Sequence, residues 1–323
     1  RSNLVIAPRV RGQFIDIFHS MDFLDTPLMG LGSVAVISTI HDISPLLYPD
    51  TFTQRHALFF RVLARPLLRR ADQVITVSQA AAAEILDWDP SLEGKLNVVY
   101  EGVNPHFRPA SSDEVAAIRA RYGLPSGYIL CVGTVQPRKN LARLIEAYAL
   151  LTARDGGTPP LVIAGGLGWL YEPIVHKVVE RRVTDRVKFL GFVPDADLPA
   201  LFTGASVFVF PSIHEGFGLP VLEAMACNLP VVTTRFGGLP DLFPSEQDGL
   251  AYGETASELI AKVAYMRDRF ASTKPGTRQM VEQYSWIETI DKLQTYLYRC
   301  FPTLEAEAAQ TSPAIWRKEQ CEL

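Results

Sequence analysis

Short apolar runs alternate with longer amphipathic stretches along most of the chain. The runs are rich in Val and Ile and lack strict alternation with polar residues, as expected for parallel strands buried on both faces. They predict strands at Ile15–Phe18, Val34–Ile40, Gln73–Val77, Leu96–Tyr100, Tyr128–Val132, Leu161–Ala164, Val187–Phe189, Val207–Phe210 and Pro230–Thr233. The stretches between them predict helices, among them Gln54–Arg70, Leu141–Ala153, Trp169–Arg182 and Pro220–Ala226. Repeated strand–helix units predict an α/β protein with doubly wound sheets.

A proline-containing linker near Gly102–Pro125 divides this pattern in two, and a polar helix is expected at Ser112–Tyr122. A length of 323 residues also suits two domains. We expect an N-terminal Rossmann-like domain at residues 1–104, a C-terminal Rossmann-like domain at 105–285, and a helix and tail at 286–323. The first domain is short, with four expected strands where five or six are usual. We therefore expect further strands to precede Arg1, which is not a Met.

Composition narrows the class of protein. The net charge of −4 gives no indication of nucleic-acid binding. The four cysteines are scattered without a Cys-x-x-Cys spacing, so neither a zinc site nor a disulfide framework is suggested. No apolar run reaches the roughly 18 residues of a membrane span, and no signal peptide is visible. A cytoplasmic protein is the simplest expectation.

A glycine-containing loop follows the expected strand Val207–Phe210. Open α/β sheets bind ligands at the carboxyl ends of their strands. Gly216 and Gly218 let backbone N–H groups approach a ligand closely. A helix is expected from Leu219, because Pro220 suits a first helical turn, and its N-terminus would attract phosphate.

Two acids flank this loop. Glu215 lies within it and Glu223 lies one turn into the helix, with seven residues between them. Glu223 has apolar neighbours, so its carboxylate requires hydrogen-bond donors, and sugar hydroxyls would serve. A structural acid that caps a neighbouring loop would give the same pattern.

Two cations occupy another loop at the end of a strand. Gly133 begins this loop, and Arg138 and Lys139 precede a helix for which Asn140 is a suitable N-cap. Fixed cations at such a place stabilise negative charge that develops on a phosphate. Arg suits bidentate phosphate binding and Lys acts as a point charge. A solvated basic turn is the alternative interpretation.

Other strand ends carry weaker signals. Gly165 ends one strand, and Phe192 and Val193 form a turn after the next. His41 follows the expected strand Val34–Ile40, in a presumed cleft. A plain turn and a structural histidine explain these positions as simply.

The run from His214 to Ala226 resembles the Glu-x7-Glu signature of the retaining GT-B glycosyltransferases of family 4. The resemblance covers roughly Ile15 to Cys300 and is strongest from Tyr128 to Asp241. It implies two Rossmann-like domains facing across a cleft, with the nucleotide sugar on the second and the acceptor mainly on the first. One departure is Thr134, which stands where many members have Arg; Arg138 is a candidate to compensate.

The resemblance also implies roles for single residues. Glu215 would approach the hydroxyls of the donor sugar, and Glu223 would hold the ribose hydroxyls. The loop amides around Gly216, Phe217, Gly218 and Leu219 would meet the sugar and the pyrophosphate. Lys139 matches a retained basic position. Backbone groups of Phe192 and Val193 would lie beside the nucleobase, and His41 would face the donor sugar and the acceptor.

We therefore expect transfer of a hexosyl group from a nucleoside-diphosphate sugar to a saccharide or lipid-linked acceptor, with retention of configuration. The pattern around Gly133 and Arg138 leans toward mannosyl- and rhamnosyl-type members, and so toward GDP-mannose over a UDP-sugar, in polysaccharide or glycolipid synthesis. An epimerase or phosphorylase of the same fold, or a non-catalytic subunit that binds the nucleotide sugar, remains an alternative.

Two further expectations concern metal and membrane. The Asp-x-Asp pairs at Asp87–Asp89 and Asp195–Asp197 lie at helix ends, where acids act as caps, so we expect no metal site and no cofactor. Residues 54–70 contain five arginines and no acid. Such a helix packs on its sheet with its apolar side, and could also contact the cytoplasmic face of an anionic membrane.

Overall fold

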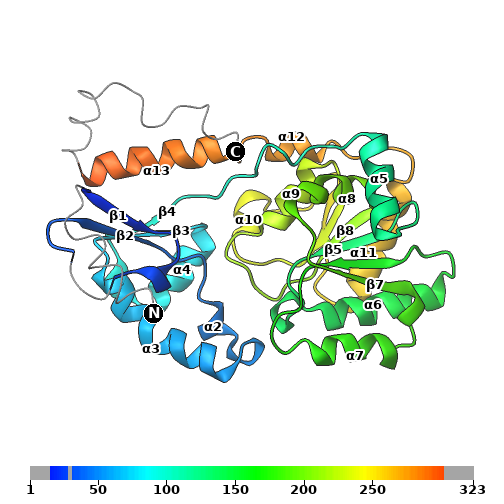
Figure 1. The fold of residues 1–323 in the computed structure, drawn as a ribbon, viewed down its shortest axis with the longest axis horizontal. Coiled ribbons are helices and arrows are strands. Elements are labelled where there is room, and N and C mark those ends of the chain that lie inside the picture. The colour runs from blue at the N-terminus through cyan, green and yellow to red at the C-terminus, as the bar shows by residue number, and fades with distance from the viewer. Residues whose placement is uncertain (1–14, 28–30, 302–323) are drawn as a thin grey trace.

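The computed structural model describes residues 15–27 and 31–301, which form two parallel sheets, each with its own helices (Figure 1). The first sheet has the order β1-β2-β3-β4. Its strands are β1 (Ile17–Ser20), β2 (Ala35–Thr39), β3 (Gln73–Thr76) and β4 (Leu96–Val98). Its helices are α2 (Ser44–Leu47), α3 (Gln54–Arg70) and α4 (Gln79–Trp88).

The second sheet has the order β10-β9-β8-β5-β6-β7, so the direction of the strand sequence reverses between β5 and β8. Its strands are β5 (Ile129–Val132), β6 (Leu161–Ala164), β7 (Val187–Gly191), β8 (Val207–Phe210), β9 (Val231–Thr233) and β10 (Leu250–Tyr252). Its helices are α5 (Ser112–Tyr122), α6 (Leu141–Arg154), α7 (Glu172–Glu180), α8 (Leu198–Gly204), α9 (Leu219–Ala226), α10 (Leu239–Leu242), α11 (Ala256–Arg269) and α12 (Thr277–Val281). This order matches that of dinucleotide-binding α/β domains.

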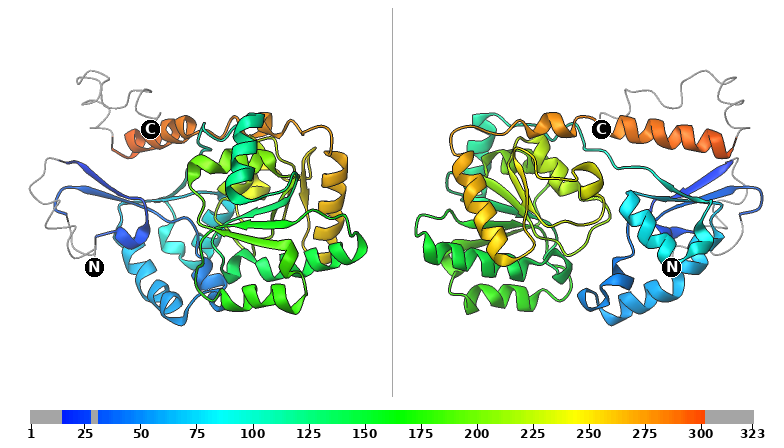
Figure 2. Two further views of the ribbon diagram at one scale, coloured as in Figure 1. Left: turned by 45° about the vertical axis from the view of Figure 1, so that its right-hand side comes forward. Right: turned by 180° about the vertical axis from the view of Figure 1, so that it is seen from behind.

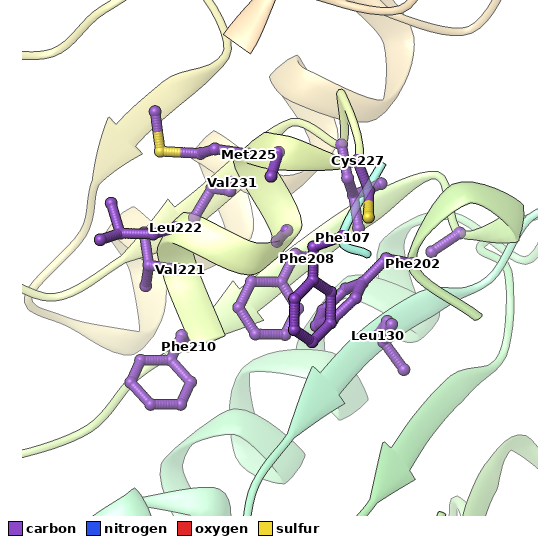
Figure 3. Close-up of a cluster of buried hydrophobic side chains, with 14 of the residues drawn as sticks. Phe107, Leu130, Phe202, Phe208, Phe210, Val221, Leu222, Met225, Cys227 and Val231 are labelled. Carbon is purple, nitrogen blue, oxygen red and sulfur yellow. The ribbon is translucent and has the colours of Figure 1, made fainter. Parts of the chain in front are cut away.

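Strand β8 explains why the apolar runs show no alternation. Phe208 and Phe210 point into the core on one face of the second sheet, and Val207 and Val209 into the core on the other. Phe202 from α8 meets Phe208 edge-on, with ring centroids 5.3 Å apart (Figure 3). Each such side chain stabilises the fold by about 1.5–3 kcal/mol when fully buried. The two cores fix the strands whose ends carry the loops described below.

Helix α13 (Trp286–Cys300) returns from the second domain to the first (Figure 2). Tyr296 packs with Ile37 and Ile75 on the face of the first sheet. Its hydroxyl accepts a hydrogen bond from Asn97 at 2.5 Å. The last helix therefore ties the end of the described chain to the first domain.

The fold class expected from the sequence, two doubly wound Rossmann-like domains, is confirmed. Several details were wrong. Strand β10 and helices α11 and α12 were missed, and Trp169 lies before α7. Asn140 precedes α6 at φ 55°, a left-handed conformation, and its side chain caps nothing. The expectation for strands before Arg1 and the tail at 302–323 lie outside the described residues.

Candidate active site

Two loops meet where the strand order of the second sheet reverses. Residues 133–140 follow β5 and residues 211–218 follow β8, and these neighbouring parallel strands end at the same edge of the sheet. The amide of Ile213 donates a hydrogen bond to the carbonyl of Arg138 at 2.9 Å, which joins the loops directly. Reversal points of this kind are where α/β sheets bind ligands. The two loops singled out in the sequence thus form one site.

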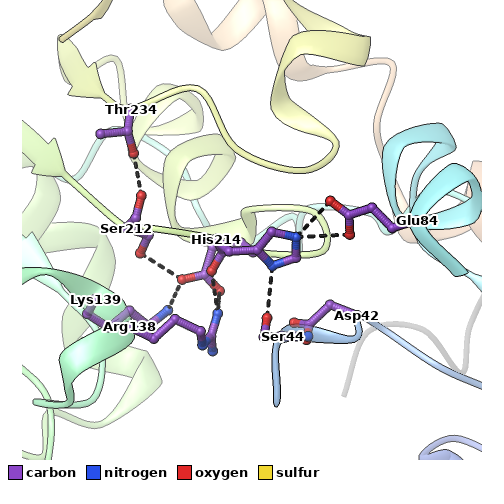
Figure 4. Close-up of polar contacts among 9 residues, drawn as sticks. Asp42, Ser44, Glu84, Arg138, Lys139, Ser212, His214 and Thr234 are labelled. Atoms are coloured by element: carbon purple, nitrogen blue, oxygen red, sulfur yellow. Dashed lines mark hydrogen bonds and ion pairs between the residues drawn. The ribbon is translucent and has the colours of Figure 1, made fainter. Parts of the chain in front are cut away.

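Glu215 is the centre of this site, because three side chains bind its carboxylate. Figure 4 labels these partners, Arg138, Lys139 and Ser212. The Glu215 carboxylate is paired with Arg138 Nη1 at 2.5 Å and with Lys139 Nζ at 2.8 Å. Ser212 Oγ donates a further hydrogen bond at 2.7 Å. The sequence predicts phosphate contacts for the two cations and a sugar contact for Glu215, whereas their pairing with one another is visible only in the structure.

Charge governs what this cluster can bind. Burial alone would raise the pKa of Glu215, but Lys139 and Arg138 outweigh burial and hold it below its usual value. Two cations and one carboxylate leave a net charge of +1 in a largely buried place. Such a cluster favours an anion that can share the cations with Glu215.

Glu223 has the opposite environment. It is half-buried on α9, and its carboxyl group forms no hydrogen bond or ion pair with other described residues. Burial, together with the charges of Asp195 and Glu101, raises its pKa to about 7. A carboxyl group in such a place gains from ligand hydroxyls that donate to it.

The loop of residues 211–218, called the glycine loop below, offers backbone hydrogen-bond donors. The N–H groups of residues 214–218 form no hydrogen bonds with the rest of the described chain. Gly218, at φ 104°, precedes α9, and no side chain caps that helix. A φ of this sign favours glycine, and uncapped N–H groups at a helix start attract anions. The side chain of Phe217 is buried against Tyr100, so a ligand would meet only its backbone.

His41 lies at the end of β2, with its ring held from two sides. Its Nδ1 is 3.3 Å from Glu101 Oε1, and its Nε2 is 3.2 Å from the carbonyl of Met21. The hydrogen bond with Glu101 raises the pKa of His41 despite partial burial. Its own carbonyl oxygen touches Gly216, where any Cβ would overlap it. His41 therefore borders the glycine loop from the first domain.

The remaining predicted positions surround the same edge of the sheet. Gly165 lies against the carbonyl of Gly133, where a Cβ would not fit. Phe192 is 78% exposed in the turn after β7, whereas Val193 is buried. That turn lies near Glu223, because Asp195 is close enough to raise the pKa of Glu223. Thr134 is exposed on the loop after β5.

The first domain contacts the glycine loop through residues that were missed or only partly understood from the sequence. Ser78 caps α4, and its hydroxyl also donates to the carbonyl of Gly216 at 2.8 Å. Asp241 accepts hydrogen bonds from the amides of Gln79 and Ala80 at the start of α4. Only the local helix-cap signal was readable in the sequence, since these partners are more than 130 residues apart.

One Asp-x-Asp expectation needs correction. Asp89 does cap a short helical turn, by accepting from the amide of Ser91, and it also pairs with Arg69. Asp197 caps no helix with its side chain. It accepts hydrogen bonds from Arg121 and Tyr122 instead, because α5 packs beside it.

Two family models match the chain. The model described as glycosyl transferases group 1 matches residues 116–269, and the model described as glycosyltransferase family 4 matches residues 5–107. O-antigen chain mannosyltransferase B of Escherichia coli is 34% identical over 260 residues, which are 77% of this chain and 66% of that protein. D-inositol 3-phosphate glycosyltransferase of Saccharomonospora viridis is 31% identical over 70% of this chain and 55% of its own. The chain thus spans about half to two thirds of these relatives.

Solved structures agree on the fold. Anabaena HepE, solved with UDP and glucose, superposes with a TM-score of 0.74 at 20% identity over 91% of this chain and 80% of its own. Sucrose-phosphate synthase from Thermosynechococcus elongatus gives a TM-score of 0.69 at 24% identity over 87% and 73%. These likenesses confirm the expected GT-B arrangement.

Proposed function

The chain belongs to family 4 of the glycosyltransferases, and from this premise we propose that it transfers a hexosyl group from a nucleoside-diphosphate sugar to an acceptor hydroxyl. The observation that carries the proposal is the pairing of Glu215 with Arg138 and Lys139, beside a loop whose backbone N–H groups have no partner among the described residues. This arrangement combines cations for a pyrophosphate with a fixed acid for sugar hydroxyls.

Each part of the donor has a partner in this proposal. The pyrophosphate lies on Arg138, Lys139 and the N-terminus of α9, which take up the charge that develops on the leaving phosphate. The ribose hydroxyls donate to Glu223, whose carboxyl has no partner in the part of the chain that the structure describes. The base lies on the turn at Phe192 and Val193, where the exposed ring of Phe192 offers a stacking surface.

We propose that the anomeric configuration is retained by attack on the same face as the departing phosphate. The carboxylate of Glu215 is held by Arg138, Lys139 and Ser212, which favours a positioning acid over a nucleophile. Fixed cations and helix N–H groups take the part that a metal ion plays in other transferases, so the proposed reaction needs no metal.

The donor and the acceptor are inferred from chemistry and likeness. The likeness to O-antigen chain mannosyltransferase B favours GDP-mannose over a UDP-sugar and a role in polysaccharide synthesis. A saccharide or lipid-linked saccharide is the proposed acceptor, placed against the first domain near His41.

The test is a panel of nucleotide sugars, including GDP-mannose, UDP-glucose and UDP-N-acetylglucosamine, measured by thermal shift and then by product formation with a mannosyl acceptor. At about 100 times its Kd, a true donor should add about 2.7 kcal/mol of stability. Transfer without inorganic phosphate supports the proposal. A requirement for phosphate would indicate a phosphorylase, and conversion of the donor without an acceptor an epimerase. Binding without turnover across a broad acceptor set would favour a non-catalytic subunit.

Helix α3 supports a further proposal, contact with an anionic membrane surface at the cytoplasmic face. Leu58, Phe59 and Val62 are each more than half exposed on its outer side. The nearby Arg55 and Arg61 are exposed and form no ion pair within the described chain. Exposed apolar side chains among arginines are typical of helices that lie on lipid. None of the described helices is long and apolar enough to cross a bilayer.

A further inference from the structure

His214 joins the glycine loop to the first domain (Figure 4). Its ring is buried, and both ring nitrogens have partners across the domain boundary. Nδ1 is 2.8 Å from Ser44 Oγ on α2, and Nε2 is 3.0 Å from both carboxylate oxygens of Glu84 on α4. The ring of Tyr48 packs on it at 5.4 Å between centroids. This one side chain thus connects three elements.

The backbone of His214 is held as firmly as its ring. Its carbonyl oxygen accepts a hydrogen bond from Arg138 Nη1 at 2.6 Å. The same guanidinium nitrogen is paired with Glu215, the next residue along the chain. A shift of His214 would therefore move the carboxylate of Glu215 relative to both of its cations.

The first domain contacts both sequence neighbours of Glu215. His214, on one side, is bound by Ser44 and Glu84. Gly216, on the other, accepts a hydrogen bond from Ser78 and lies in contact with the carbonyl of His41. Among the described residues, the side chain of Glu215 is bound only by residues of the second domain. Its position therefore depends on domain contacts that its neighbours make.

We infer that His214, Ser44 and Glu84 are positioning residues that make the placement of Glu215 depend on contact between the two domains. The inference rests on the proposed function, because it assigns Glu215 to the donor sugar. The partners complement each other in chemistry: Nε2–H donates to the carboxylate, and Nδ1 accepts from the hydroxyl. Alanine at any of the three would leave a buried polar group without its partner, which is costly.

The kinetic test uses Glu84→Ala, Ser44→Ala, His214→Ala and the double variant Glu84→Ala/His214→Ala. A lost hydrogen bond to a charged group predicts that kcat falls roughly tenfold or more for Glu84→Ala. The Kd for GDP or UDP should stay within about twofold of the original value, because the residues proposed to bind the phosphates and the ribose belong to the second domain. The double variant should be no slower than His214→Ala, since Glu84 acts through His214. Glu84→Gln keeps an acceptor for Nε2–H and should recover part of the rate.

Glu93→Ala is the matched control, because Glu93 is an exposed acid of the first domain whose side chain forms no hydrogen bond or ion pair in the described structure. The kcat of this variant should be unchanged. A kcat for Glu84→Ala and Ser44→Ala within twofold of the original enzyme would overturn the inference. Multiplicative effects of Glu84→Ala and His214→Ala would also overturn it. If one variant fails to fold, by its melting temperature, the other still decides.

A second readout separates this inference from the proposed function. Small-angle X-ray scattering of the nucleotide-bound protein should give a larger radius of gyration for Glu84→Ala than for Glu93→Ala, because a contact between the domains is lost. This result needs no turnover. If no nucleotide sugar is a donor, the proposed function fails, but the scattering comparison still tests the contact of His214 with Ser44 and Glu84. An identical radius of gyration in both variants, with transfer intact, would reject the proposed role of the contact between His214 and Glu84 and leave the proposed function standing.

Discussion

At the residue scale, the two acids of the glycine loop and α9 are in opposite environments. Glu215 is buried with two cations, and its pKa is lowered. Glu223 lacks a partner within the described chain, and burial raises its pKa to about 7. The charged form of Glu215 is stabilised by the protein itself, whereas Glu223 would gain hydrogen-bond donors from a ligand. Their spacing in the sequence predicts a paired site but not this division, which depends on residues distant in the chain.

Glu223 predicts a measurable dependence of stability on pH. Its folded pKa is above its unfolded value of about 4.5, so the folded protein binds more protons between about pH 4.5 and 7. Stability from this group is therefore complete below pH 4.5 and is lost as pH rises to about 7. Glu223→Gln should raise the free energy of unfolding at pH 8 by on the order of 2 kcal/mol, with little gain at pH 4.5. Urea unfolding at both pH values checks this.

The same substitution should weaken nucleotide binding, because Gln is a poorer acceptor for ribose hydroxyls. Glu282→Gln, at an exposed acid on the surface, is the control and should change neither quantity by much. Equal stability gains at pH 4.5 and pH 8 would show that Glu223 is not the titrating group.

At the element scale, the sequence predicted the positions of most strands and of the loops that follow them. The Val- and Ile-rich runs predicted nine of the ten described strands, and glycine and proline marked the loops that form the site. Strand β10 was missed because Leu250–Tyr252 contains neither Val nor Ile and lies between Gly249 and Gly253, so it lacks the pattern that predicted the other strands. Asn140 was misjudged because the left-handed backbone ahead of α6 comes from how the loop folds back, and sequence type alone does not reveal this.

Helix α3 carries the membrane prediction. Phe59→Ser/Val62→Ser should reduce sedimentation with vesicles that contain anionic lipid, and Arg55→Glu/Arg61→Glu should reduce it by about tenfold or more, at roughly 1 kcal/mol for each arginine near the surface. The arginine effect should fade at high salt.

Leu150→Ser is the control for α3, since Leu150 is a comparably exposed leucine on α6 of the second domain. It should bind vesicles as the unaltered chain does. Equal binding to neutral and anionic vesicles, or no loss in either α3 double variant, would refute the contact.

At the scale of the whole molecule, the site is complete only where the two domains meet. Arg138, Lys139, Glu215 and Glu223 all come from the second domain and were found in the sequence. The contacts of His214 with Ser44 and Glu84 join residues 170 and 130 positions apart, and no local pattern reports such pairs. The return of α13 to the first sheet was likewise visible only in three dimensions.

In the proposed mechanism, Glu215 acts on the donor sugar while Arg138 and Lys139 hold its carboxylate. Its most direct test is the rate of hexosyl transfer by Glu215→Gln, measured beside the Kd for the nucleoside diphosphate and the melting temperature. We expect a loss of at least about 1,000-fold in kcat, as for removal of a main electrostatic group, with the nucleotide still bound. Undiminished transfer by a folded Glu215→Gln protein would contradict the account.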